Sequence, residues 1–205
     1  MIDLDVFLPR ILPYAPGCAE PTALASIIKA AQTFCERTRL WRDRDQFNVT
    51  PSNCNVVCAP NGAELLEIES ARFFNGCLLE PISLADLDAK HPAWRQMSEG
   101  TGRWITQTEP GSVLLVPACT GTLELSTILR PTDDAEQLPD LFSQYTQVIA
   151  DGALGDILML PAQSFSNPEL AQFYSMRFDN RIYELFNRTI QGQQRAPVRS
   201  RARFF

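Results

Sequence analysis

The 205-residue chain is 45% hydrophobic and 20% charged, with a formal net charge of −6, as expected for an ordinary globular protein with one core or a core with one elaboration. Its longest apolar runs, such as 113–116, are far shorter than the roughly 20 residues of a membrane span. The opening MIDLDVFLPR has acids where a secretion signal has bases and then a long apolar run, so we expect a mature start at Met1.

The six cysteines do not follow a disulfide or zinc-site pattern. Cys54 and Cys58 make a poor zinc half-site, because no second pair follows them at a suitable spacing. A chain of this length can bury a core without disulfides, so we expect small reduced thiols and no bound metal. The cysteines are Cys18, Cys35, Cys54, Cys58, Cys77 and Cys119.

An amphipathic helix is predicted over residues 21–42, and the rest of the chain is organised around it. Its apolar residues recur at steps of three and four, and Pro21 suits the first helical position. Such a stripe must be buried, and stretches 139–160 and 168–191 carry matching stripes. Before the helix, prolines interrupt the apolar segment 4–20, which predicts two short turns or a broken helix. The stripe consists of Leu24, Ile27, Ile28, Ala31, Phe34, Cys35 and Thr38.

From Arg44 to Pro131 the apolar residues alternate, which predicts short strands separated by turn signals. Asn75-Gly76 is the strongest hairpin signal in the chain. A short helix over 83–96, with Ser83 as its cap, interrupts the strands. We therefore expect a small antiparallel sandwich or barrel inserted between helices. The strands are predicted at 46–50, 56–58, 63–70, 72–79, 103–108, 112–116 and 122–129.

Two more helices are predicted after the strands. The second helix, near 139–160, includes Gly152 and Ala153, which would let a neighbouring helix approach closely. The third begins with Asn167 as its cap and Pro168 at its first position. A seven-residue connector, 161–167, predicts an antiparallel hairpin of these two helices.

These elements predict an α+β fold. Its core is a helical bundle of one N-terminal helix and a C-terminal helical hairpin, with an inserted antiparallel β-sandwich or barrel-like domain and an extended C-terminal arm. The expected parts are 1–43 and 132–191 for the core, 44–131 for the β insertion and 192–205 for the arm.

The last fourteen residues are basic and lack a helical stripe. They carry a charge of +4, which leaves −10 for the rest of the chain. The tail is either a disordered solubilising end or an arm that folds on binding, with arginines pairing to carboxylates and aromatics filling apolar pockets. Nucleic acid is a third possible target, which the acidic body disfavours. The residues predicted for the arm are Arg195, Arg199, Arg201, Arg203, Phe204 and Phe205.

The sequence gives no positive signal for catalysis. His91 is the single histidine, and its place before Pro92 favours a surface or locally hydrogen-bonded role. Glu67 and Glu69 share one predicted strand face, as a solvated acidic surface would. No phosphate-binding glycine loop, nucleophile elbow or dinucleotide fingerprint occurs. We therefore predict no catalytic residue, no cofactor and no enzyme activity.

Two alternative functions use the β insertion. One is a cell-wall glycan hydrolase in which Glu67 or Glu69 supplies acid–base chemistry. The other is a carbohydrate-binding module that uses Trp94 or Trp104 as a stacking surface.

Several stretches resemble a known family. The segments 12–18 and 30–41 resemble the opening of head-to-tail adaptor proteins of tailed bacteriophages. The later segment 151–161, followed by Asn167-Pro168 and Phe173-Tyr174, resembles the same family. The order of helix, β insertion, helical hairpin and tail is similar over most of the chain.

The resemblance implies a structural virion protein that forms a ring, usually of twelve copies, in the neck between portal and tail. It implies that the portal protein and tail or nozzle proteins are the partners, and that the C-terminal arm reaches into the portal. It also implies assembly in the host bacterial cytoplasm, without a membrane. A repeated heterologous interface closes such a ring. DNA would pass through the lumen without sequence-specific binding, and an acidic inner wall would let it slide.

Overall fold

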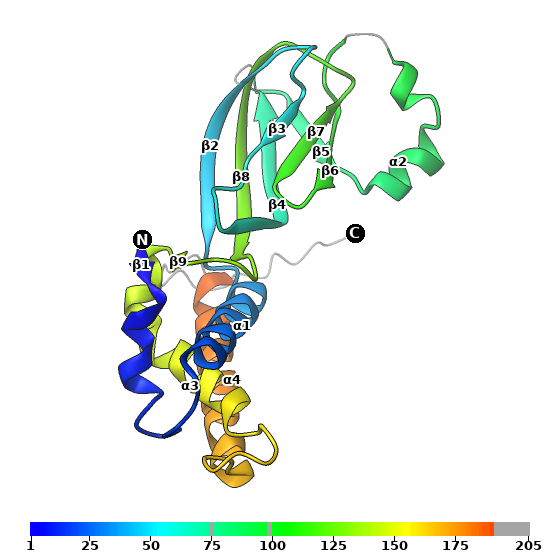
Figure 1. Cartoon of the computed structure of the whole chain (residues 1–205). Coiled ribbons are helices and arrows are strands. Elements are labelled where there is room, and N and C mark those ends of the chain that lie inside the picture. The colour runs from blue at the N-terminus through cyan, green and yellow to red at the C-terminus, as the bar shows by residue number, and fades with distance from the viewer. Residues whose placement is uncertain (74–75, 98–99, 191–205) are drawn as a thin grey trace, which may run out of the picture. The chain divides into compact units, whose positions relative to one another are not determined.

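The computed structural model describes residues 1–73, 76–97 and 100–190 (Figure 1). The fold is α+β, and the chain divides into two units. Met1–Leu40 and the described residues from Leu138 onwards form what we call the helical unit. Trp41–Gln137 form the β unit. In the sequence, the β unit therefore lies between the two parts of the helical unit.

The N-terminal segment is a broken helix, as its prolines predict. After β1 (Ile2–Asp3) comes η1 (Leu4–Arg10), a 3-10 helix that contains Pro9. Leu4 and Phe7, one 3-10 turn apart, are buried. They anchor this segment against the long helices of the same unit.

The first long helix, α1 (Glu20–Thr38), begins one residue before Pro21 and ends earlier than predicted. It ends because Arg39 adopts a left-handed conformation with φ 54°, and its N–H donates to the Cys35 carbonyl as a cap. The predicted stripe is buried from Ile27 to Thr38, whereas Leu24 is only half-buried.

The C-terminal part starts differently from the prediction. Where one helix over 139–160 is predicted, the chain forms β9 (Gln137–Leu138), which pairs with β1, then the 3-10 helix η3 (Asp140–Tyr145) and α3 (Thr146–Ile157). The third helix, α4 (Pro168–Ile190), begins as predicted. The Leu170 N–H donates to Asn167 Oδ1 at 3.1 Å, so Asn167 is the cap.

Helices α1, α3 and α4 pack against one another, and α3 and α4 are antiparallel. Gly152 lies beside Phe178, and Gly155 lies beside Ser175. A Cβ on Gly152 would meet both the Ala30 Cβ and the Phe178 ring at 3.0 Å, which confirms the predicted close approach. The approach at Gly155 is tighter still. Glycine is needed at both positions because the helices leave no room for a side chain.

The β unit contains one seven-stranded sheet in the order β2-β8-β4-β5-β6-β7-β3. Neighbouring strands are antiparallel except β5 and β6, which are parallel and correct the prediction of a purely antiparallel insertion. The connection between them contains α2 (Leu84–Lys90) and η2 (Trp94–Gln96), and this crossover lets β6 run in the same direction as β5. The strands are β2 (Arg42–Val49), β3 (Asn55–Val57), β4 (Ala63–Phe73), β5 (Leu78–Pro81), β6 (Trp104–Glu109), β7 (Ser112–Val116) and β8 (Gly121–Pro131).

The sheet must curl, because its two edge strands are consecutive in the chain. A flat sheet would hold β2 and β3 roughly 29 Å apart, at about 4.8 Å per strand. The chain from Val49 to Asn55 can span only about 21 Å. The Leu65 N–H also donates to the Pro110 carbonyl in the β6–β7 turn at 2.7 Å, which joins β4 to the far part of the sheet. Of the two predicted architectures, the nearly closed barrel therefore fits better than the sandwich.

Two local predictions in this unit are confirmed. β4 and β5 pair with Ala71 opposite Leu79, and Gly76 has φ +84°, as a hairpin turn of this kind requires. Asn75 lies outside the described residues. At the start of α2, Ser83 Oγ accepts the Asp86 N–H at 3.1 Å, so Ser83 is the cap.

Candidate functional site

The six residues predicted for the portal arm lie outside the described residues. Their binding role stays a prediction that rests on the sequence. The remaining candidate sites lie on one unit or the other, and each can be assessed by its geometry.

The carboxylates proposed for acid–base chemistry lie on the exposed face of β4. Glu69 pairs with Arg42 at 3.1 Å. Glu64, on the same strand, pairs with Arg130 at 2.6 Å. Glu67 is exposed, as a solvated face predicts. Ion pairs between strands on one face of a sheet are typical of a surface that stabilises the sheet.

The Arg42–Glu69 pair belongs to a larger set that we call the charged ladder. It runs across β2, β8 and β4, where Glu124 contacts both Arg44 and Arg72. The Ser126 hydroxyl, on the same surface, donates to Glu69 at 3.1 Å. The charges of the ladder are thus largely balanced within one chain. Its members are Arg42, Arg44, Glu69, Arg72 and Glu124.

The two candidate sugar-stacking tryptophans already have partners. The Trp104 ring packs on the His91 ring, with centroids 4.2 Å apart and planes at 32°. The Arg95 guanidinium lies 4.3 Å over the Trp94 ring, and Trp94 Nε1 donates to Asp88 at 2.7 Å. Hydrogen bonds from Arg95 and Trp94 lower the pKa of Asp88. The local role predicted for His91 agrees with this stacking.

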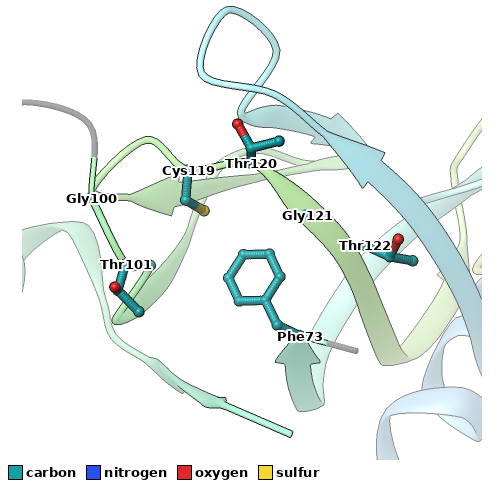
Figure 2. A pocket seen from close by; sticks show the side chains of 8 residues that line it. Phe73, Gly100, Thr101, Cys119, Thr120, Gly121 and Thr122 are labelled. Carbon is teal, nitrogen blue, oxygen red and sulfur yellow. The ribbon is translucent and has the colours of Figure 1, made fainter. Parts of the chain in front are cut away.

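A pocket of about 380 Å³ opens in the β unit (Figure 2). Figure 2 shows the Cys119 thiol directed toward the Phe73 ring. A Cβ on Gly102 would lie 2.9 Å from that ring and 3.0 Å from the thiol sulfur, so both side chains pack directly on Gly102 and leave no room there for a side chain. The lining residues are Phe73, Gly100, Thr101, Gly102, Cys119, Thr120, Gly121 and Thr122.

The chemistry of this pocket does not suit catalysis. Burial raises the pKa of the Cys119 thiol, so the nucleophilic thiolate is disfavoured. Among the described residues that line the pocket, none has a carboxylate, imidazole or amine that could act as a base. The pocket offers hydroxyls, a thiol and an aromatic ring only.

Among the described residues no disulfide forms, and four of the six cysteines are buried. Burial raises the pKa of Cys58 to about 11, with the Asp43 carboxylate adding to the effect, and burial also raises the pKa of Cys18. Within residues 1–73, 76–97 and 100–190, no cluster of three or more His, Cys, Asp or Glu side chains could hold a metal ion.

The helical unit contains a buried polar cluster that was not predicted from the sequence. Asp151 of α3 is almost fully buried, and it accepts hydrogen bonds from Arg177 Nε at 2.8 Å and Gln147 Nε2 at 2.9 Å. Arg10 donates to Gln147 at 2.9 Å. The cluster joins η1, α3 and α4. The signal in the sequence was an acid inside an apolar helical run, where an acid is normally buried only with a partner.

A second polar contact joins α1 to α3. Lys29 pairs with Asp156, and Ser26 Oγ donates to the same carboxylate at 3.1 Å. Serine, lysine and aspartate can form catalytic groups, but a lysine ammonium that donates to a carboxylate has no lone pair to accept the serine proton. This contact therefore positions two helices.

The exposed side of α4 carries large apolar side chains. Phe173, Met176 and Tyr183 are 54%, 59% and 68% exposed. Tyr14 is 51% exposed and packs on Tyr174, whose ring also contacts Phe173. We call Tyr14, Phe173, Met176 and Tyr183 the outer patch. An apolar surface of this kind suits contact with another protein.

A family model described as SU10 adaptor protein matches residues 8–201, which includes both units and part of the basic tail. No curated protein matches the chain. None of the helices among the described residues is long and apolar enough to cross a bilayer.

Proposed function

The chain belongs to the SU10 adaptor protein family of bacteriophage structural proteins, and on that premise we propose that it is a head-to-tail adaptor. It would form a ring, of twelve copies, that joins the portal to the tail in the virion neck. The observation that carries this proposal is the extent of the family match. It covers residues 8–201 and thus reaches Arg201 in the basic tail.

The charge distribution supports the two roles within this proposal. The body of the chain carries −10, so a lumen lined by it would repel DNA and let it slide. The tail carries +4 and ends in Phe204 and Phe205. Arginines pair well with carboxylates, and terminal aromatics fill apolar pockets, so the tail suits docking on the portal as an arm.

The arm can be tested by truncation. We expect a chain that lacks residues 192–205 to keep the thermal unfolding transition of the full chain, because the tail follows the last residue of α4. We expect it to lose co-sedimentation with the portal of the same phage. Retention of portal binding by the truncated chain would contradict the arm proposal.

Two matched variants separate the contributions within the arm. Replacement of Arg195, Arg199, Arg201 and Arg203 by glutamate should abolish binding, whereas replacement by lysine keeps the charge and should weaken binding by less. Phe204→Ser with Phe205→Ser tests the apolar anchor alone. If all these variants bind like the full chain, the portal contact lies elsewhere.

A further inference from the structure

Helix α4 has apolar residues on two opposite sides. Tyr174, Phe178, Ile182 and Leu185 are buried within the helical unit. At about 100° per residue, Phe173, Met176 and Tyr183 fall about half a turn away from that buried side. A helix that is apolar on both sides is typically packed on both sides. The helical unit covers one of them.

The outer patch has the size and composition of part of a protein interface. With about 200 Å² for each of its four large side chains, it exposes on the order of 450 Å². A standard interface buries roughly 800 Å² on each partner, so the patch supplies about half of one side. Aromatic residues and methionine are enriched at interface cores, where charged residues are depleted.

The charges beside the patch argue against the basic arm and DNA as its occupant. Arg181 pairs with Glu184 on the same helix, and Arg177 pairs with Asp151. Asp179 pairs with Arg37. The arm's four arginines would gain little from carboxylates that are already paired, and DNA phosphates would gain little from paired arginines. The patch therefore suits an apolar protein surface.

The N-terminal segment offers such a surface. In a 3-10 helix, residues three apart lie on the same side, so Val6 and Pro9 of η1 form an exposed apolar ridge. Their side differs from that of Leu4 and Phe7, which are buried. η1 packs on α1 and α3, and α4 packs on the same two helices. One helical unit thus carries two different exposed apolar surfaces, as a head-to-tail contact requires.

We propose that the outer patch of one copy packs against the Val6–Pro9 ridge of a second copy of this chain. Repeated from copy to copy, this contact would close the adaptor ring, so its assembly role rests on the proposed function. This contact would bury the second apolar side of α4, which the other elements of the same helical unit leave exposed.

Photo-crosslinking tests the contact in the full chain. We would replace Tyr183 with p-benzoylphenylalanine, mix isotopically light and heavy protein with the portal, irradiate, and identify crosslinked peptides by mass spectrometry. The expected product joins Tyr183 of one isotopic form to the tryptic peptide Met1–Arg10 of the other. The matched control places the crosslinker at Leu78, which is 69% exposed but lies on the β unit. The proposal would be overturned if Tyr183 crosslinks only within one copy, only to the arm or only to the portal. It would also be overturned if the crosslinker at Leu78 reaches Met1–Arg10 equally well.

Charge substitution separates this proposal from the proposed function. We expect Met176→Glu and Tyr183→Glu to leave the unfolding of the chain unchanged and to weaken copy–copy association at least about tenfold, while Leu78→Glu has no such effect. If the unmodified chain caps the portal and Tyr183→Glu forms the same ring, the outer-patch proposal is wrong. If the unmodified chain self-associates through the outer patch but does not bind the portal, the proposed portal function is wrong and the proposed contact between copies is supported.

Discussion

Two surfaces of the molecule, one on each unit, differ in how their exposed side chains are paired. On the β unit, the charged ladder balances its own charges across three strands, from Arg42 with Glu69 to Arg44 with Glu124. On the helical unit, the outer side of α4 exposes Phe173, Met176 and Tyr183. A surface of paired charges is stable in water, whereas an apolar patch gains free energy when another protein covers it. This difference agrees with the proposal that contacts between copies use the helical unit.

The interiors differ as well. The helical unit is held by side chains that pack between helices far apart in the sequence, including a buried charge at Asp151. The β unit has its own apolar interior, which includes the fully buried Ile105, Leu123 and Leu129. It is also held by strand pairing and by turns with special backbone geometry, such as Gly76. We expect the largest losses of stability where a large side chain is fully buried.

The largest effect is expected from Phe34→Ala. The Phe34 ring is fully buried and lies 5.7 Å from the Phe142 ring and 5.1 Å from the Tyr145 ring. Its loss should lower the free energy of unfolding by about 4 kcal/mol, measured by urea denaturation. The control Phe173→Ala, on the exposed side of α4, should change it by less than about 0.5 kcal/mol. Similar losses of unfolding free energy for the two variants would contradict the assignment of Phe34 to the core and of Phe173 to the exposed side of α4.

A smaller effect is expected from Asp151→Asn. The substitution removes the charge that Arg177 contacts, and because Arg177 is partly exposed we expect a loss of about 2 kcal/mol. A double-mutant cycle with Arg177→Gln should show coupling between the two residues. Glu184→Gln, which breaks the exposed pair with Arg181, should cost no more than about 0.5 kcal/mol. Absence of coupling would show that the buried pair does not join α3 to α4.

In the β unit, Gly76→Ala should cost about 1 kcal/mol. Space is not the reason, because a Cβ at Gly76 would meet nothing within 4 Å. The cost comes from φ +84°, which side chains disfavour. Gly111→Ala is the control, since its Cβ would make an ordinary 3.5 Å contact with Ala59 and should be nearly neutral. If both changes are neutral, the hairpin does not depend on this conformation.

The smallest expected effect is a difference in the rate at which two thiols are alkylated. With a pKa of about 11, Cys58 is roughly one part in a thousand thiolate at pH 8, and burial restricts access to it. Since the thiolate is the reactive form, its alkylation should accelerate as the pH rises toward 11. Peptide mass spectrometry should show that half-buried Cys77 is labelled well before Cys58. Equal rates at pH 8 would indicate that the β unit opens around Cys58.

Local signals predicted much of the fold. Asn167 and Ser83 cap the helices they were expected to cap, and the turns of the β unit lie where glycine, proline and asparagine predict them. These features depend on a few adjacent residues, which a single sequence contains.

Features that depend on distant residues were missed. The parallel pairing of β5 and β6 depends on where the crossover through α2 returns, and no residue within either strand encodes that direction. The close contact at Gly155 and the partner of Asp151 both come from α4, about twenty residues further along the chain. At Arg39, the left-handed cap lacks the usual glycine, so no residue there predicts the end of α1.

The adaptor role is tested most directly by electron microscopy of the full chain mixed with the portal of its own phage. We expect a ring that caps the portal, with α4 at the contact between copies and density for the C-terminal arm in the portal. Absence of association at moderate salt would contradict the adaptor role.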